Sequence, residues 1–425
     1  MKNLKNVLKS ERVQTGKKTV IDNYNNYLKS REKAQEDVDI DTLKEKLKEI
    51  KKYSIQNLDE LKRKAIKNLK EQNIQVFEAK DAKEARKIAL KLIPKGKKVV
   101  KSKSNVVNEI GLEKILLEKN EFTETDCGDF IIQITEEEEC HPVSPAIHIP
   151  LEKITENIKK KFKTKLPNDP VKITHWIRDY IKKKIFEADV GITGANVVSS
   201  DGGIFILENE GNISLVSRLP KKHIIITSID KIVPTTEDAM KICKAAAIWG
   251  SGVPLPTYIN VISSLSRTAD VQKNLVWGMY GPEEVSVILV DNGRTQMIKE
   301  GFTELLECIN CGACLFPCPI YRNILDKYGF HYFGGRGVGL TVFQEGLKKG
   351  FESGMYYCTT CELCKKNCPM DIDIPKVIKK LRKRAVKENL ETEVNSKMMD
   401  NVRTSGNPFG EDVKEGEIPD KLYCC

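Results

Sequence analysis

Eight cysteines in two runs of identical spacing limit what this chain can fold into. The first run is Cys308, Cys311, Cys314 and Cys318 followed by Pro319, and the second is Cys358, Cys361, Cys364 and Cys368 followed by Pro369. Each run has the spacing C-x2-C-x2-C-x3-C-P, by which bacterial-type ferredoxins hold 4Fe-4S clusters, with the fourth cysteine ligating the other cluster. We therefore predict two 4Fe-4S clusters. The first cluster is assigned to Cys308, Cys311, Cys314 and Cys368, and the second cluster to Cys358, Cys361, Cys364 and Cys318.

Two other uses of these cysteines fit the pattern less well. A structural zinc site uses four ligands in two pairs, and it needs neither the third closely spaced cysteine nor the terminal Cys-Pro that both runs contain. Disulfides are disfavoured because cysteines this dense, in a lysine-rich chain without a secretory signal, are typical of a reducing compartment.

The length and composition indicate a globular protein of two or three domains. The chain has 425 residues, of which 40% are hydrophobic and 31% are charged, as is ordinary for such proteins. No apolar run approaches the roughly 20 residues that a membrane-spanning helix needs. The N-terminal segment MKNLKNVLKSERVQTGKK has no apolar core that could serve as an export signal. We expect a soluble, cytoplasmic protein without a transmembrane segment.

The net charge of +10 is concentrated at the N-terminus. Residues 1–100 contain 27 Lys and Arg against 15 Asp and Glu, so they hold the whole positive excess. This segment has helical periodicity and almost no interleaved aromatic residues, which favours a solvated helical face over nucleic-acid binding. A docking surface for an acidic partner is the alternative.

The hydrophobic pattern predicts an α/β domain between helical segments. Amphipathic helices are expected at 20–36, 41–53 and 55–72, where they would cover a later sheet. Short apolar runs then alternate with helical stretches, which argues for a largely parallel sheet. The expected strands lie at 76–77, 98–100, 130–134, 189–193, 203–207, 213–217, 223–227, 256–263 and 285–290. The expected helices lie at 82–93, 151–163, 170–187 and 236–248.

These patterns divide the chain into four parts. They are an N-terminal helical segment at 1–60, an α/β domain at 61–299, a two-cluster ferredoxin-type domain at 300–388 and an irregular tail at 389–425. The insert between the cysteine runs, 319–357, is rich in glycine, which fits either close backbone approach or a flexible loop. A basic helix is expected from Pro375 to about 388.

Polar and glycine-rich segments next to the predicted strands mark a candidate ligand crevice, because open α/β sheets bind ligands at strand ends. No GxGxxG opens a helix and no GxxxxGK[ST] occurs, so neither a dinucleotide nor a phosphate-loop site is predicted. The crevice candidates are Thr193, Gly194, Asn196, Asp201, Gly202, Glu210, Asn212 and Arg294.

Several of these side chains have two interpretations. Glu208 and Glu210 are either a turn between strands or candidates for the covalent glutamate nucleophile of a related fold. Arg294 either pairs with a substrate carboxylate or ties the α/β domain to the cluster domain through an ion pair. Catalytic residues are not assigned, since no Ser-His-Asp constellation can be argued.

Other residues with metal-ligand chemistry are not assigned to a site. The histidines at 141, 148, 175, 223 and 331 have no metal-ligand spacing. Cys424 and Cys425 are either the end of a solvated tail or part of a further cluster that a partner completes.

The sequence also resembles a known family, the lactate utilization iron-sulfur protein B family. The resemblance spans about residues 23–382. It is carried by VVKSKSNVVNEIGL, ETDCGDFIIQ, PVSPAIH, ADVGITGANVVSSDGGIFILENEGN, KIVPTTED, GPEEVSVILVDNGR and CINCGACLFPCPIYR. It implies a LUD domain, with the open-sheet fold shared by CoA transferases and ribose-5-phosphate isomerase. Cys127 stands where the family usually has an aliphatic residue, and a buried free thiol explains it better than a reactive one.

The resemblance implies an electron-carrying subunit rather than a complete dehydrogenase. Its substrate would be L-lactate or another 2-hydroxy acid, and its partners a cysteine-rich CCG-domain protein and a second LUD protein or a flavoprotein. The C-terminal third, with its GNPFGE segment, also resembles iron-sulfur subunits of heterodisulfide reductase and glycolate oxidase. The alternative is a LUD domain that binds or transforms a phosphorylated or acyl-CoA ligand, with the clusters as a redox sensor.

Overall fold

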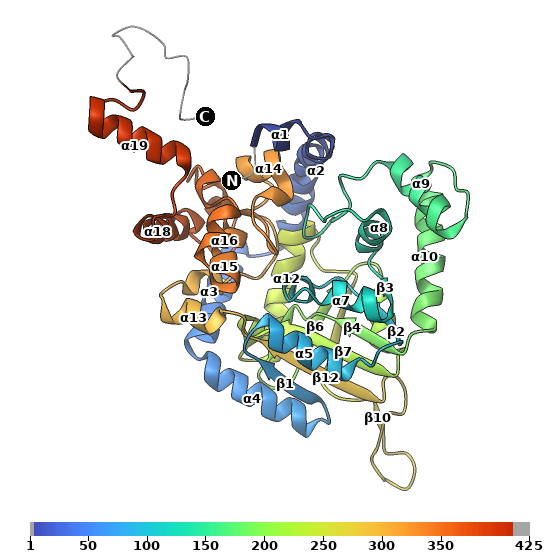
Figure 1. The fold of residues 1–425 in the computed structure, drawn as a ribbon. Coiled ribbons are helices and arrows are strands. Elements are labelled where there is room, and N and C mark those ends of the chain that lie inside the picture. The colour runs from blue at the N-terminus through green and yellow to red at the C-terminus, as the bar shows by residue number, and fades with distance from the viewer. Residues whose placement is uncertain (1–3, 411–425) are drawn as a thin grey trace.

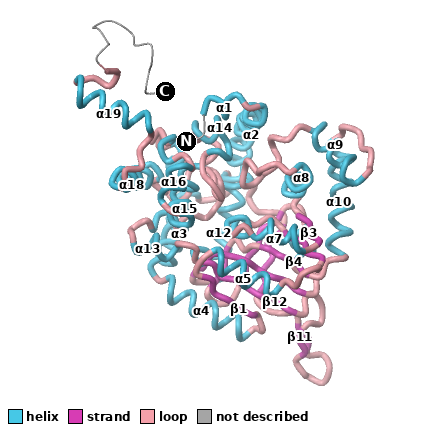
Figure 2. The backbone as a smooth tube through the Cα atoms, viewed as in Figure 1, coloured by secondary structure: helices cyan, strands magenta, loops and turns pink. Residues whose placement is uncertain are grey.

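The computed structural model describes residues 4–410. The tail cysteines Cys424 and Cys425 lie outside these residues. The described part comprises an α/β domain built on a parallel sheet and a helical domain that contains both cysteine runs, as Figures 1 and 2 show. The predicted fold class is confirmed.

The centre of the α/β domain is a six-stranded sheet in which all neighbouring strands are parallel. Its order is β1-β12-β7-β4-β2-β3. The strands are β1 (Gln75–Ala79), β2 (Lys98–Lys101), β3 (Glu121–Glu124), β4 (Val190–Thr193), β7 (Lys222–Ser228) and β12 (Glu284–Val290). The inner strands β7 and β12 are buried on both faces, which explains their continuous runs of β-branched residues.

Helices cover both faces of this sheet. On one face lie α5 (Ala82–Leu92), α6 (Asn105–Glu109) and α7 (Leu112–Lys119), whose apolar residues form one core with alternate residues of the strands. The other face is covered by α4 (Leu58–Glu71) at one end. At the other end it packs against α8 (Cys127–Thr135), α9 (Leu151–Phe162) and α10 (Pro170–Phe186).

A second sheet of four strands, which the sequence pattern did not predict, lies beside α4. Its order is β8-β5-β6-β9, and two of its three pairs are antiparallel. Its elements are β5 (Val197–Ser199), β6 (Ile204–Glu208), β8 (Ile232–Val233) and β9 (Tyr258–Ile262), packed against α12 (Thr236–Ser251). The hairpin β10 (Arg267–Thr268) and β11 (Val276–Trp277) projects from the domain (Figure 1).

Two predicted strands are helices, so those predictions were wrong. Residues 130–134 lie in α8, where Asp126 caps the first turn by accepting from the Asp129 N–H and where Phe130 and Ile134 are buried on one face. Residues 213–217 overlap α11 (Asn212–Val216), in which Ile213 and Val216 are buried. In both segments a short apolar run fits a buried strand and one helical face equally well.

The N-terminal helices serve both domains. They are α1 (Leu4–Lys9), α2 (Glu11–Gln35) and α3 (Ile40–Gln56), followed by α4. Helix α4 contacts β1 and β8 as predicted, whereas α2 packs against α12 and the cluster domain. The Tyr27 ring stacks on Phe316 at 4.6 Å, and its hydroxyl donates to the Trp249 carbonyl.

The cluster domain is helical. Its helices are α13 (Arg294–Lys299), α14 (Pro319–Ile324), α15 (Gly334–Glu345), α16 (Leu347–Glu352), α17 (Leu363–Lys366), α18 (Ile374–Lys387) and α19 (Glu393–Ser405). The glycine-rich insert is therefore no flexible loop. A Cβ on Gly337 would lie 1.8 Å from the Tyr332 carbonyl oxygen, so glycine permits the close approach of α15 to the preceding segment. Helix α19 corrects the prediction that the tail is irregular throughout.

No helix among residues 4–410 is long and apolar enough to cross a membrane.

Candidate functional site

The eight thiols of the cysteine runs lie in two neighbouring groups. Burial raises the pKa of Cys311, and the charges of Cys308 and Cys368 raise it further. Burial likewise raises the pKa of Cys364 to about 12, with Cys318, Cys358 and Cys361 acting in the same direction. The fourth cysteine of each run thus lies close enough to a cysteine of the other run to influence its pKa. The ligand assignment itself stays a prediction.

The two cysteine loops have the same backbone conformation. Asn310 and Gly312 in the first loop have φ values of 58° and 78°, and the equivalent Thr360 and Glu362 in the second have 56° and 62°. These left-handed values turn the chain twice within four residues, which directs three cysteines toward one side. The Asn310 N–H donates to Cys308 Sγ at 3.3 Å. The second loop adopts this conformation without glycine, at a steric cost.

The left-handed conformation of Glu362 predicts that glycine is more stable than alanine at this position. Glu362→Gly should be more stable than Glu362→Ala by about 1 kcal/mol, because alanine keeps the Cβ that the left-handed conformation disfavours while both variants lose the carboxylate. The measurement is the temperature at which the anaerobic holoprotein loses its absorption near 400 nm. Equal temperatures for the two variants would show that the backbone of this loop is not strained.

Six of the eight thiols line two small cavities. One cavity is lined by Cys318, Cys358, Cys361 and Cys364, the other by Cys308, and Cys314 lines both. An all-thiolate donor set is typical of 4Fe-4S clusters. Among the described residues, no three His, Cys, Asp or Glu side chains converge closely enough to hold one metal ion, whereas a cluster spreads its four thiolates over four irons.

The large sheet has its topological switch point at the ends of β2 and β4. The connection after β2 leads outward to β3, whereas the connection after β4 leads to β7 on the other side. Ligand crevices of open α/β sheets form at such a switch point. Gly194, which follows β4, lies so close to Ser104, which follows β2, that a Cβ would come 2.7 Å from the Ser104 Oγ.

Part of the predicted crevice set lies at this switch point. Glu210 accepts from the Cys127 N–H at 3.1 Å, and the Asn212 side chain donates to Thr125 at 3.1 Å. Thr193 is also at the end of β4, but its hydroxyl is buried against His223 at 2.8 Å and faces no crevice.

The other predicted crevice residues lie elsewhere. Asn196 accepts from the Leu207 N–H, and Asp201 accepts from the Thr236 N–H and hydroxyl. Both bonds are internal to the second sheet and its flanking helix. Gly202, with a φ of 101°, forms the tight β5–β6 turn next to Asn68. The eight residues therefore do not form one site, because the strand after β4 leaves the large sheet and joins the second one. The sequence gives no sign of this change of sheet.

Three charged side chains that the sequence analysis did not single out, Lys103, Asp129 and Glu139, join Glu210 around the switch point. The Lys103 ammonium lies 3.0 Å from Asp129 Oδ1. Burial and then the charge of Asp126 raise the pKa of Glu210 to about 7. Burial also raises the pKa of Glu139 to about 7, against the opposing charge of Lys103. The carboxyl groups of Glu139 and Glu210 can therefore each gain or lose a proton near neutral pH.

Neither candidate nucleophile of this region is activated. Glu208 is buried and accepts from Ser214 and Asn260, which supports the interpretation of this segment as a turn. Burial, followed by Glu210 and Asp126, raises the pKa of Cys127 to about 12, so the thiol stays protonated at neutral pH.

A cleft of about 1190 Å³ begins beside Asp129 and adjoins the cavity of the first cysteine group. One wall comes from α7, β3 and α8 and includes Glu113 and Asp129, and the other comes from the insert before α15 and includes Phe330. Glu139, His331 and Phe333 line both this cleft and the cavity of Cys308 and Cys314. The four consecutive glutamates at 136–139 also line the cleft. They were the one sequence feature that could have indicated it, and they match no motif.

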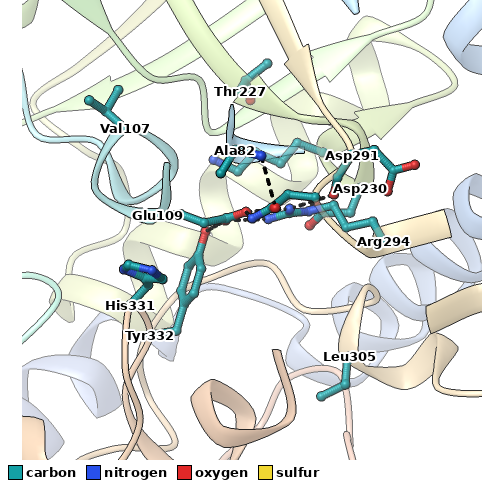
Figure 3. Close-up of polar contacts among 12 residues, drawn as sticks. Ala82, Val107, Glu109, Thr227, Asp230, Asp291, Arg294, Leu305, His331 and Tyr332 are labelled. Atoms are coloured by element: carbon teal, nitrogen blue, oxygen red, sulfur yellow. Dashed lines mark hydrogen bonds and ion pairs between the residues drawn. The ribbon is translucent and has the colours of Figure 1, made fainter. Parts of the chain in front are cut away.

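Arg294 is part of a buried network that joins the two domains (Figure 3). It is 2% exposed and forms two hydrogen bonds of 2.8 Å with Glu109, and it also binds Asp230. Tyr332 of the cluster domain donates to the same Glu109 at 2.7 Å. The guanidinium is therefore saturated by carboxylates of its own chain, which corrects its prediction as a crevice residue and leaves the structural interpretation.

Three histidines are buried and neutral. Burial lowers the pKa of His141 and His223 to about 3 and that of His148 to about 4.

Comparison with known proteins identifies both parts of the chain. The LUD domain family matches residues 62–290, and the 4Fe-4S dicluster domain family matches residues 304–372. The dicluster match confirms the expectation of two 4Fe-4S clusters.

Curated relatives match along most of the chain. Lactate utilization protein B 1 of Bacillus mycoides (strain KBAB4) is 33% identical over 80% of this chain and 70% of its own length. Lactate utilization protein B of Bacillus subtilis (strain 168) is 32% identical over 82% of this chain and 72% of its own length. A crystal structure of a duf162 family protein from Deinococcus radiodurans aligns with a TM-score of 0.31 at 14% identity, covering 55% of this chain and 98% of that one.

Proposed function

The chain belongs to the lactate utilization protein B family, and on this premise we propose that it is the iron-sulfur electron-transfer subunit of a complex that oxidises L-lactate or another 2-hydroxy acid. Bound 4Fe-4S clusters supply one-electron transfer. A two-electron substrate therefore requires a flavin or a second redox site on a partner.

The observation that carries this proposal is the junction between the cleft and the first cysteine group. Glu139, His331 and Phe333 line both spaces, so a donor held in the cleft lies next to the thiols of Cys308 and Cys314. Oxidation of a 2-hydroxy acid also releases protons. Glu139, which lines the cleft and has a pKa of about 7, is placed to take them up.

The second cysteine group is the proposed point at which electrons leave the chain. Of the eight cysteines in the two runs, all within the described residues, Cys361 is the exposed one. The cavities of the two groups share Cys314, Leu315 and Arg336. The proposed electron path therefore runs from the cleft through the first and then the second cysteine group to the surface. We assign the acceptor at Cys361 to a cysteine-rich CCG-domain protein, and the donor at the cleft to a second LUD protein or a flavoprotein.

The test is reduction of the clusters by substrate. The anaerobic holoprotein mixed with L-lactate and the proposed partners should lose absorption near 400 nm, while the chain with L-lactate alone should not. D-lactate is the matched control. Absence of bleaching with every partner present would contradict the lactate assignment.

A second candidate function rests on the switch point. Lys103, Asp129 and Glu210 are an acid–base set of the kind that enzymes use on small metabolites. In this case the LUD domain itself transforms the substrate, and bleaching by the chain alone would be the distinguishing result.

A further inference from the structure

Arg336 occupies a special place between the two cysteine groups. It lies in the first turn of α15 and lines the cavities of both groups. Burial opposes its charge, but Cys308, Tyr332, Asp230 and Cys314 together raise the pKa of its guanidinium. Arginine stays protonated in proteins, so a fixed positive charge faces the thiols of the first group.

The contacts of Arg336 leave its charge uncompensated by carboxylates. Its Nε donates to the Leu305 carbonyl at 3.3 Å, and its guanidinium lies 5.4 Å from the centre of the Tyr332 ring. Within residues 4–410 it forms no ion pair with an Asp or Glu side chain.

Lys51 brings a second positive charge to the same region. It is buried on α3, its ammonium donates to the Asp230 carbonyl rather than to the carboxylate, and the charge of Cys308 acts on it. The described part of the chain offers it no ion pair either. Glu307, next to Cys308 in the sequence, influences Lys51 less than Asp230 and Cys308 do.

The buried carboxylates of this region are already bound. Glu109 and Asp230 both pair with Arg294, as Figure 3 shows. Around Asp230, the cations Arg294, Arg336, Lys51 and Lys231 outnumber the two buried carboxylates Glu109 and Asp230, so positive charge is in excess on this side of the first group. Uncompensated buried charge is costly, which calls for an anion in the adjoining cavity.

A cluster held by four thiolates is that anion. It is negatively charged when oxidised and gains one further negative charge when reduced, so a nearby fixed cation stabilises the reduced form more than the oxidised form. We propose that Arg336, assisted by Lys51, raises the reduction potential of the first cluster and so makes it the acceptor next to the cleft. The role as acceptor rests on the proposed function, whereas the effect on the potential does not.

The test is a redox titration of the isolated anaerobic holoprotein, followed by electron paramagnetic resonance. In Arg336→Gln the reduced-to-oxidised ratio of the first cluster at a fixed potential should fall about tenfold, a shift of about 59 mV to lower potential for one electron. Lys51→Met should shift the same signal in the same direction. The signal is assigned with Cys361→Ser, in which the first cluster keeps all its ligands.

Two variants serve as controls. Arg336→Lys keeps the charge and should stay within about threefold of the native ratio. Lys52→Met removes an exposed lysine next to Lys51 and should leave both potentials unchanged. If Arg336→Gln does not retain its iron, the shift in the reduction potential of Lys51→Met becomes the test of the inference.

Unchanged potentials, or an equal shift of both clusters, would overturn the inference. The redox titration uses neither L-lactate nor a partner protein, so failure of the lactate assignment would not affect its result. A native holoprotein without two distinguishable signals would contradict the cluster assignment instead.

Discussion

Replacing Cys318 with serine should remove the cluster of the other cysteine run and leave its own run loaded. Burial raises the pKa of Cys318, and the charges of Cys358 and Cys361 raise it further, in accord with the predicted place of this thiol in the second cluster. The iron content should fall from about eight atoms to about four. Iron analysis and the reduced spectrum measure the loss.

Cys368→Ser is the reciprocal variant. Its thiol lies near Cys308, so it should lose the first cluster and keep the second. Cys127→Ser, which changes a protonated thiol at the switch point, is the control and should keep both clusters. If Cys318→Ser and Cys368→Ser each lose the cluster of their own run, the crossed assignment is wrong.

Replacing Arg294 with methionine should destabilise the fold by about 3 to 5 kcal/mol, the usual cost of removing one partner from a buried ion pair. Glu109 and Asp230 would remain buried with their main counter-charge removed. Tyr332 donates to Glu109, which Arg294 would no longer hold in place, so the contact between the domains should weaken as well. Anaerobic unfolding in guanidinium, followed by circular dichroism, measures the change.

The pH dependence has a defined sign. Burial opposes ionisation of Asp230, but Arg294, together with Lys51, Ser228 and Lys231, outweighs burial and holds the pKa of this carboxyl below its usual value. The native ion pair therefore contributes stability above the ordinary carboxyl pKa of about 4, and this contribution is lost as the pH falls through the lower folded value. In Arg294→Met burial dominates, so protonation relieves the penalty. The difference between native protein and variant should shrink between pH 7 and about pH 4.

Arg178→Met is the matched control. Its partner is Asp179, and the two side chains are 61% and 65% exposed, so water and salt screen the pair. This substitution should change the unfolding free energy little. A cost for Arg294→Met no larger than that for Arg178→Met would show that the buried network does not hold the two domains together.

The sequence was sufficient for features that depend on local spacing. The run of β-branched residues 223–227 predicted β7, and the apolar periodicity after Thr236 predicted α12, because one strand or one helix face leaves a regular pattern. It was insufficient where a short apolar run fits two structures. The residues Phe130 to Ile134 became a helix because Asp126 caps the turn before them.

The candidate sites divide in the same way. The cysteine runs could be assigned from spacing alone, since the ligands of each loop lie within seven residues and the chemistry of thiolates for iron is specific. Thr193, Asn196 and Asp201 could not be sorted from sequence. Whether a polar residue after a strand faces a crevice depends on which sheet the next strand joins, and β5 leaves the large sheet.

The sequence by itself determined that the chain carries two cluster-binding loops after an α/β domain, because cysteine spacing and hydrophobic period are local properties. Tertiary structure alone decided the rest. It brought Tyr332 to Glu109 and Arg294, and it placed Arg336 at the cavity that Cys308 lines. These residues are far apart in the chain, and the charge that each one feels depends on burial and on neighbours that only the packed domains supply.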